Sequence, residues 1–197
     1  MPKIYNYKQP FYHSIIYDYY DENEQNLIWQ EIDFLNQPGK LLTPDRTGDE
    51  NASPNKMGIF LDDIYHHKEF RKLSNILTLN RKIFFILDLL KENIFSNYLS
   101  ISNYDLTLLS YYGNNAYYNS HYDKFIVSSV TTFWKTPKEF QGGNLMFDHY
   151  NYTPDLDHNS MIIFPSFEWH SVSPVIMKPS FNNGRYSINQ FFSFRSS

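Results

Sequence analysis

Apolar and polar positions near the start of the chain predict a strand followed by a helix. Residues 10–20, PFYHSIIYDYY, have the composition of a short strand with aromatic flanks. Residues 21–36, DENEQNLIWQEIDFLN, begin with acidic side chains, which suit the positive end of a helix dipole. Ile28, Ile32 and Leu35 then recur at helical spacing. We therefore expect one amphipathic helix directly after the strand.

Turn-forming residues follow this predicted helix. Pro38 and Gly39 are expected to end it. Residues 40–58, KLLTPDRTGDENASPNKMG, are polar and rich in turn formers, so we interpret them as a long loop and a candidate substrate lid. Residues 69–95, EFRKLSNILTLNRKIFFILDLLKENIF, predict one or two further helices.

From Tyr104 onward the pattern changes to short runs of strand type, separated by Gly, Pro, Asn and Asp. Helices first and strands afterwards favour a β-sandwich or barrel core with helices packed against it. We expect one domain over 1–197, with residues 1–103 as helical support and loop and residues 104–194 as the β core. The runs are YDLTLLSYY, FIVSSVTTFW, GGNLMF, SMIIFPS, WHSVSPV and RYSINQFFSF.

Composition supports a globular protein with a large sheet. The 197 residues suit one domain, and 42% of them are hydrophobic. Aromatic residues make up 19%, and these side chains fit pleated surfaces. The net charge of −4, without a basic block, argues against nucleic-acid binding and against binding to a membrane surface.

The absence of cysteine excludes disulfides, thiolate metal sites and cysteine nucleophiles. The first 20 residues lack the apolar core of a signal peptide, and no apolar run approaches transmembrane length. We therefore expect a cytoplasmic location. Nothing in the sequence indicates an oligomeric state.

The segment YYNSHYDKF carries the first candidate chemistry. His121 and Asp123 lie two residues apart, so in an extended segment their side chains share a face. His170 is the best third partner, because an apolar strand ends in Pro165 and a short turn then leads into the strand that His170 opens. Two histidines and one carboxylate on one face of a metal are typical of non-haem Fe(II) oxygenases.

Arg185 is the second candidate feature. It opens the predicted strand RYSINQFF, and an arginine inside a barrel is costly unless it binds an anion. Its planar guanidinium suits a carboxylate. Asn189 lies four residues further on, hence on the same strand face, where it could add a hydrogen bond.

Less specific interpretations stand beside these. His121 and Asp123 could form a surface pair in a turn, and Arg185 could lie on an exposed edge strand. Gly142 and Gly143 predict a turn before a strand rather than a phosphate loop, because no helix follows them. The polar loop DHYNYTPDLDHNS holds two histidines and three aspartates that could imitate a metal site, although a solvated loop is the favoured interpretation: His149, His158, Asp148, Asp155 and Asp157.

The order of these motifs resembles the Fe(II)- and 2-oxoglutarate-dependent dioxygenases, and most of all their prolyl 4-hydroxylase-like branch. The motifs are H-x-D, GGNLMF, MIIFPSFEWHSVSPV and GRYSINQFF, and residues 104–194 carry the resemblance. The N-terminal strand and helix are also similar to those of the family. The resemblance implies a mainly β fold, a double-stranded β-helix (a distorted, cupin-like jelly roll), with helices packed on one sheet.

The resemblance also implies roles for individual residues. His121, Asp123 and His170 would bind Fe(II), and Arg185 would pair with the distal carboxylate of 2-oxoglutarate. Tyr112 matches the tyrosine that hydrogen-bonds the co-substrate. Tyr118 matches a second pocket aromatic. Since tyrosines stand in pairs at 111–112 and 117–118, each tyrosine match holds to within one residue.

The first functional hypothesis is hydroxylation of a prolyl residue in a peptide or protein. The family chemistry consumes O2 and 2-oxoglutarate, releases succinate and CO2, and can use ascorbate as a reductant. A second hypothesis replaces the peptide with a free amino acid or other small metabolite. A third is a cupin-like, non-catalytic binding protein. A zinc hydrolase is disfavoured because H-E-x-x-H is absent, and a halogenase because Asp123 is present.

Overall fold

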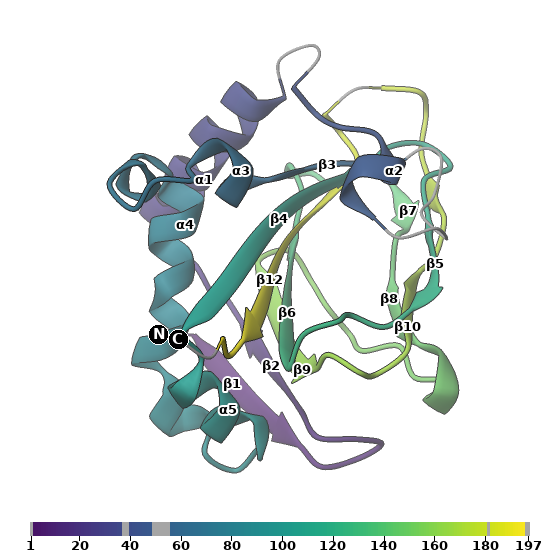
Figure 1. Ribbon diagram of the computed structural model, residues 1–197. Coiled ribbons are helices and arrows are strands. Elements are labelled where there is room, and N and C mark those ends of the chain that lie inside the picture. The colour runs from purple at the N-terminus through teal and green to yellow at the C-terminus, as the bar shows by residue number, and fades with distance from the viewer. Residues whose placement is uncertain (1, 37–39, 49–55, 181, 196–197) are drawn as a thin grey trace.

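The computed structural model describes residues 2–36, 40–48, 56–180 and 182–195. Within them the strands form a seven-stranded sheet in the order β1-β2-β9-β6-β12-β4-β3, a three-stranded sheet in the order β5-β10-β8, and a small pair, β11-β7. Figure 1 shows most of the helices against one side of the large sheet and the three-stranded sheet facing its other side. This jelly roll with helices on one sheet confirms the predicted fold class.

The N-terminal elements follow the predicted order. The predicted strand is β2 (His13–Tyr17), which pairs with the unpredicted strand β1 (Lys3–Tyr7). The predicted helix is α1 (Glu22–Leu35), whose first turn is closed by a capping box between Asp21 and Glu24. Its residues Ile28, Ile32 and Leu35 are buried, as their spacing predicted. Pro38 and Gly39, the expected helix end, lie outside the described residues, and the helix ends at Leu35.

The prediction of a continuous loop over residues 40–58 is wrong at both ends. The segment contains α2 (Pro44–Thr47), and its last residues begin strand β3 (Lys56–Phe60), which pairs in register with β4 (Tyr104–Tyr112). Gly58 obscured this strand in the sequence. The glycine is needed because a Cβ there would lie 2.9 Å from the carbonyl oxygen of Leu109. Residues 49–55, the centre of the candidate lid, lie outside the described residues.

The prediction of one or two helices over 69–95 is also wrong, because the chain forms short helical segments instead. Polar side chains at two of the breaks bond to distant residues. Asn80 accepts a hydrogen bond from the Tyr20 hydroxyl, and Asn93 donates one to the carbonyl of His13. The segments from 61 onward are α3 (Leu61–Ile64), η1 (Phe70–Leu73), α4 (Asn75–Asn80), η2 (Arg81–Phe85), η3 (Leu87–Leu90) and α5 (Phe95–Ile101).

The C-terminal half forms strands where the sequence predicted them. Each of the six predicted runs contains or overlaps a strand, two of them also touch a second short strand at one end, and β5 lies outside the runs. After β4 the elements are β5 (Tyr118–His121), β6 (Val127–Phe133), β7 (Gln141–Gly142), β8 (Leu145–Phe147), η4 (Asp148–Tyr150), β9 (Ser160–Pro165), β10 (His170–Val172), β11 (Val175–Ile176) and β12 (Arg185–Ser193).

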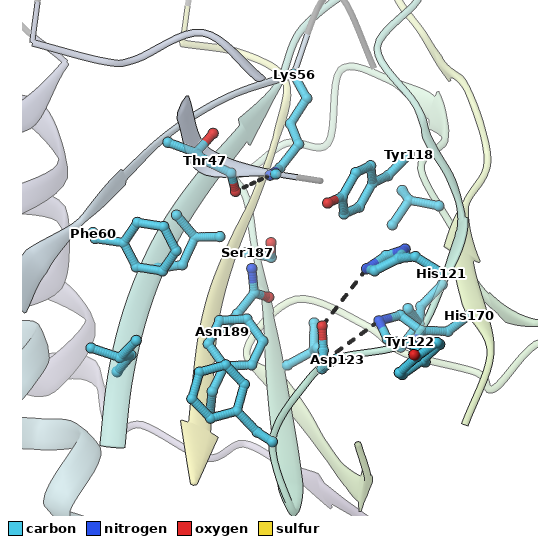
Figure 2. Close-up of a pocket in the computed structure, with 18 of the residues that line it drawn as sticks. Thr47, Lys56, Phe60, Tyr118, His121, Tyr122, Asp123, His170, Ser187 and Asn189 are labelled. Carbon is cyan, nitrogen blue, oxygen red and sulfur yellow. Dashed lines mark hydrogen bonds and ion pairs between the residues drawn. The ribbon is translucent and has the colours of Figure 1, made fainter. Parts of the chain in front are cut away.

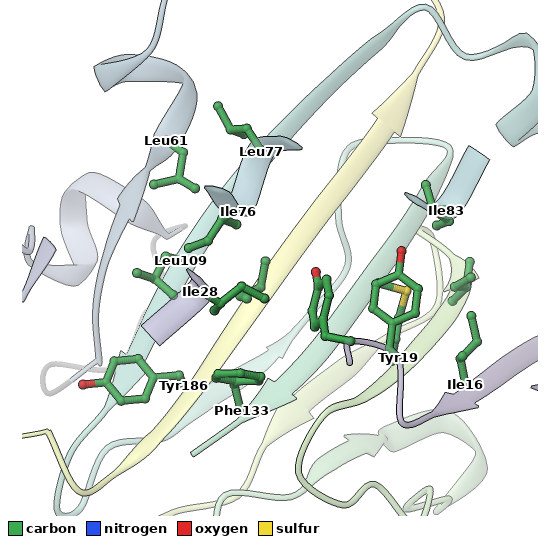
Figure 3. Close-up of a cluster of buried hydrophobic side chains, with 14 of the residues drawn as sticks. Ile16, Tyr19, Ile28, Leu61, Ile76, Leu77, Ile83, Leu109, Phe133 and Tyr186 are labelled. Atoms are coloured by element: carbon green, nitrogen blue, oxygen red, sulfur yellow. The ribbon is translucent and has the colours of Figure 1, made fainter. Parts of the chain in front are cut away.

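The large sheet separates an apolar core from the pocket. On its helix side, Leu109 of β4, Phe133 of β6 and Tyr186 of β12 pack against Ile28 and Ile76 from the helices (Figure 3). Side chains of the same strands alternate to the other side, where they face the three-stranded sheet. No helix among the described residues is long and apolar enough to cross a membrane.

Candidate metal centre

Three side chains converge between the two sheets. His121 ends β5 and His170 begins β10, and the two residues face each other in that antiparallel pair. Asp123 follows β5 by two residues. Its Oδ1 lies 3.8 Å from Nε2 of His121, and its Oδ2 lies 3.8 Å from Nε2 of His170 (Figure 2). The three candidate ligand atoms lie within 4.8 Å of one another. The structure therefore brings the predicted triad together.

Both imidazoles are oriented by backbone carbonyls. Nδ1 of His121 lies 2.9 Å from the carbonyl oxygen of Asn119, and Nδ1 of His170 lies 2.8 Å from that of Glu168. A carbonyl only accepts, so each Nδ1 carries the hydrogen and each Nε2 directs a lone pair at the centre. Burial lowers the pKa of His170, which favours the neutral, metal-binding form.

Two serines orient the carboxylate of Asp123. The Ser128 hydroxyl of β6 donates to Oδ2 over 2.6 Å, and it lies 2.8 Å from the Ser166 hydroxyl. The backbone N–H of Asp123 donates to the carbonyl of Ser166 over 2.9 Å. The carboxylate is therefore held by the large sheet, although the residue itself follows a strand of the small sheet.

Asp148 links the two strands that carry the histidines. Its carboxylate accepts from the Ser120 hydroxyl of β5 over 2.7 Å and from the Ser171 hydroxyl of β10 over 2.8 Å. Each serine is the sequence neighbour of one histidine of the triad. Among the described residues, the triad is the group of His, Asp and Glu placed to hold a metal ion. The polar loop that holds Asp148 therefore supports the two strands that carry the histidines of the triad.

The donor set fits Fe(II). Two imidazole nitrogens and one carboxylate occupy one side of the centre, which leaves the other side open to the pocket. Nitrogen and oxygen donors in this facial arrangement suit non-haem iron. Since the chain contains no cysteine, a thiolate site is excluded.

Arg185 lies in the same pocket, as the first residue of β12. It is only 1% exposed, and its Nη1 and Nη2 have no hydrogen-bond partner among the described residues. Burial lowers its pKa, although an arginine remains charged in proteins. Gly143 makes room for it, since a Cβ there would lie 2.9 Å from Cδ of Arg185. A buried cation with two unsatisfied nitrogens requires an anion.

Tyr112 and Tyr111 are neighbours on β4, so their side chains point to opposite faces of the sheet. Tyr112 pairs with Arg185 across β4 and β12, and its ring centroid lies 5.1 Å from Cζ of Arg185. Burial raises the pKa of Tyr112, so it remains a neutral hydroxyl. Tyr111 instead packs in the helix-side core, 4.9 Å from the ring of Tyr186. Of the two adjacent tyrosines, Tyr112 is therefore the one on the pocket side.

The other two predicted residues also line the pocket. The Tyr118 ring centroid lies 4.0 Å from that of His121. Asn189 lies on the same face of β12 as Arg185, and its amide donates to the Ser110 hydroxyl over 3.4 Å. The pocket encloses about 380 Å³, and its walls are mostly apolar, including Phe60, Leu108 and Phe191.

Sequence reasoning assigned no role at this site to four residues that lie around it: Ser128, Ser166, Asp148 and Lys56. Strand alternation in FIVSSVTTFW could have placed Ser128 on the same face as Val130, which lines the pocket. No local pattern indicated the roles of Asp148 and Ser166, because their partners lie on other strands. Lys56 was assigned to the loop over 40–58.

Comparison with known proteins supports the same family resemblance. Residues 106–193 match the model of the 2OG-Fe(II) oxygenase superfamily. This match confirms the resemblance that the motif order indicated, and it implies Fe(II) and 2-oxoglutarate as cofactors. No curated protein matches the chain.

Solved structures confirm the fold. A prolyl-4-hydroxylase from Pseudomonas putida has a TM-score of 0.61 at 18% identity, with 93% of each chain covered. A prolyl hydroxylase from Trichoplax adhaerens, bound to a hypoxia inducible factor peptide fragment, has a TM-score of 0.58 at 14% identity, covering 92% of this chain and 83% of that one. NgTET1 in complex with 5mC DNA has a TM-score of 0.59 at 12% identity, with 93% of this chain and 72% of that chain covered. The predicted exclusion of nucleic acid stays a prediction.

Proposed function

We propose that the chain is an Fe(II)- and 2-oxoglutarate-dependent dioxygenase that hydroxylates a prolyl residue in a peptide or protein. The carrying observation is that the His121, Asp123 and His170 triad and the buried Arg185 open into one pocket. The similar fold of two prolyl hydroxylases, one bound to a peptide, supports the prolyl substrate. The alternative substrate is a free amino acid or other small metabolite, whose carboxylate would meet the cations that line the pocket besides Arg185: Arg46, Lys56 and Lys124.

We assign each residue a role from its position. His121 and His170 bind Fe(II) through Nε2, and Asp123 binds it through its carboxylate, oriented by Ser128. When bound, Fe(II) and 2-oxoglutarate activate O2, so that one oxygen atom enters succinate as CO2 is released and the other enters a C–H bond of the substrate. Arg185 holds the distal carboxylate of 2-oxoglutarate in a bidentate pair.

The pocket wall supports this chemistry. The neutral Tyr112 hydroxyl can donate a hydrogen bond to the co-substrate, and Asn189 adds an amide on the same side. Tyr118 packs against His121 and shields one side of the triad. Apolar side chains such as Leu108 keep water from the oxidant's surroundings.

We also propose that residues 1–197 form one domain. The helix-side core contains side chains from both halves, such as Ile28 and Ile76 from residues 1–103 and Ile188 from residues 104–194. Separating the halves would expose this core on both sides, which supports a single folding unit.

An anaerobic absorption spectrum tests the proposed function. Adding Fe(II) and then 2-oxoglutarate should produce a visible charge-transfer band. The band should be absent in His170→Ala and lost or weakened in Arg185→Ala, while His66→Ala, which removes an exposed histidine remote from the pocket, should retain it. Absence of the band in folded wild-type protein would contradict the oxygenase and favour the cupin-like binding protein.

A substrate assay then tests the finer proposal. Succinate formation and a mass increase of about 16 Da are measured on proline peptides, free amino acids and other small acids in the presence of O2 and ascorbate. Hydroxylation of a proline peptide supports the prolyl assignment. Turnover confined to a free amino acid would replace the prolyl assignment and leave the reaction class intact.

A further inference from the structure

A row of three side chains crosses the large sheet on its pocket side. Lys56 of β3 pairs with Tyr112 of β4, and Tyr112 pairs with Arg185 of β12. Directly paired residues on neighbouring strands point to the same face of a sheet, and neighbouring strands lie about 4.8 Å apart. The backbones of Lys56 and Arg185 are thus about 10 Å apart, and both side chains line the pocket.

The ammonium group of Lys56 lies close to the metal triad. The side chain is only 1% exposed, and Nζ donates to the carbonyl of Thr47 over 3.2 Å (Figure 2). Nζ also lies 4.6 Å from the Tyr118 ring centroid, and that ring lies 4.0 Å from the His121 ring. A single aromatic ring therefore separates this ammonium from a metal ligand.

Positive and negative charges that line the pocket do not balance among the described residues once the cofactors are counted. Fe(II), the Asp123 carboxylate, the two carboxylates of 2-oxoglutarate and the Arg185 guanidinium together sum to zero. The other charged lining residues in the described part of the chain are Arg46, Lys56 and Lys124, all cations. Once the cofactors are bound, the described lining of the space left for the substrate therefore carries positive charge.

Resting on the proposed function, we propose that Lys56 recognises a carboxylate of the substrate, with Arg46 and Lys124 adding positive charge at the mouth. The recognised group lies on the triad's side of the pocket, because only the Tyr118 ring separates Lys56 from His121. A buried lysine binds a carboxylate by a charge-assisted hydrogen bond. The carboxylate comes either from a free amino acid or from an acidic residue beside the target in a peptide.

Matched probes test this substrate class. One set pairs each free amino acid with its amide, which lacks the carboxylate. The other set pairs capped peptides that carry Glu or Gln beside the target residue. Succinate formation is measured for every probe with wild-type protein, Lys56→Met, Lys56→Arg and Lys138→Met. Lys138 is a matched control, because its ammonium also lies over aromatic rings but does not line the pocket.

We expect the carboxylate member of the productive pair to be favoured about 10- to 100-fold in kcat/KM. Lys56→Met should abolish this preference, whereas Lys56→Arg and Lys138→Met should retain it. Lys124→Met, at an exposed position where the fold is not at risk, should reduce the preference a few-fold. The amino-acid set and the peptide set distinguish the two sources of the carboxylate.

The charge-transfer band separates this inference from the proposed function. Lys56→Met should titrate with 2-oxoglutarate within about threefold of wild type, because Arg185 holds the co-substrate. A large loss of 2-oxoglutarate affinity would assign Lys56 to the co-substrate and overturn the inference. Equal turnover of both members of each pair, or no turnover of any carboxylate probe by protein that forms the band, would overturn it too. A missing band in wild type would instead reject the proposed function.

Discussion

The two faces of β12 differ in what covers their side chains. On the helix face, Tyr186, Ile188 and Phe192 are buried in the apolar core, where side chains from the helices cover them. On the pocket face, Arg185, Ser187 and Asn189 alternate with them and face open space between the sheets. One strand thus serves packing on one side and ligand binding on the other.

The contrast shows how a stable sheet can carry an incomplete site. The helix face buries apolar area, and this burial is a main source of stability. The pocket face instead buries a guanidinium whose terminal nitrogens lack partners among the described residues, which costs free energy in the absence of an anion. The first face should therefore control folding, and the second should control binding.

Among substitutions that test this difference between the two faces, Ile188→Ala should have the largest effect on stability. Ile188 is 1% exposed in the helix-side core, so truncation should lower the free energy of unfolding by about 2–5 kcal/mol. Urea unfolding of the metal-free protein measures this change. Its neighbour Ser187→Ala, on the pocket face, should change the free energy of unfolding by less than about 1 kcal/mol. Equal losses at both positions would contradict the division of roles.

Arg185→Met should produce opposite changes in binding and stability. Losing the bidentate charged pair should weaken 2-oxoglutarate binding by about 2–3 kcal/mol, or roughly 30- to 150-fold. The unliganded protein should unfold at the same or a higher urea concentration, because a buried cation is replaced by an apolar side chain of similar length.

Titration of the charge-transfer band and urea unfolding of the same sample measure both changes for Arg185→Met. Arg195→Met is the control, since Arg195 is exposed and stacks on Tyr104 away from the pocket. Marked destabilisation of Arg185→Met without loss of 2-oxoglutarate binding would assign the arginine a structural role.

The sequence predicted the pocket face better than the supporting helices. Strand alternation and the order of four residues along the chain can both be read directly from the sequence. The structure brings these residues together: His121, Asp123, His170 and Arg185. The region over 69–95 was misread because its apolar residues are compatible with a long helix, whereas Asn80 and Asn93 bond to distant residues. Such tertiary bonds have no local signal.

The same reasoning explains which site residues were found. All three metal ligands are residue types that bind metals, and two of them, His121 and Asp123, lie two residues apart, so a sequence can reveal them. Ser128 and Asp148 are common polar residues whose role depends on strands that meet only in the fold. Lys56 was hidden by Gly58, which made its strand resemble a turn.

Ser128→Ala tests whether the large sheet orients the metal ligand on the small one. Removing the hydroxyl that donates to Asp123 should weaken Fe(II) binding about 10-fold, because outer hydrogen bonds fix a ligand's geometry. A competition titration with a metal chelator measures the affinity. Ser187→Ala, which also lies on the pocket face but donates no hydrogen bond to the triad in this structure, is the control. Unchanged Fe(II) affinity in Ser128→Ala would reject the orienting role.

The smallest expected effect concerns His13, a buried residue whose two ring nitrogens both have hydrogen-bond partners within the chain. Its Nδ1 lies 2.9 Å from the carbonyl oxygen of Phe11, and its Nε2 lies 3.1 Å from the Tyr152 hydroxyl. Burial lowers the pKa of His13 in the folded state, although the bond to Phe11 opposes this. The unfolded chain therefore binds a proton more readily, with a histidine pKa near 6.5. Stability from this group is complete above that pH and declines as the pH falls toward the folded pKa.

His13→Gln should therefore reduce the loss of stability on acidification. Urea unfolding of the metal-free protein at pH 7.5 and pH 5.5 gives the difference, with His66→Gln, at an exposed position, as the matched control. The variant retains hydrogen-bonding groups but cannot be protonated in the unfolded chain, so its two free energies should differ by less than those of wild type. His158 and His170 also have lowered pKa values and should retain the rest of the pH dependence. An unchanged pH dependence in His13→Gln would contradict this prediction. It would mean that the folded protein accommodates the charged imidazole of His13 as well as the neutral one.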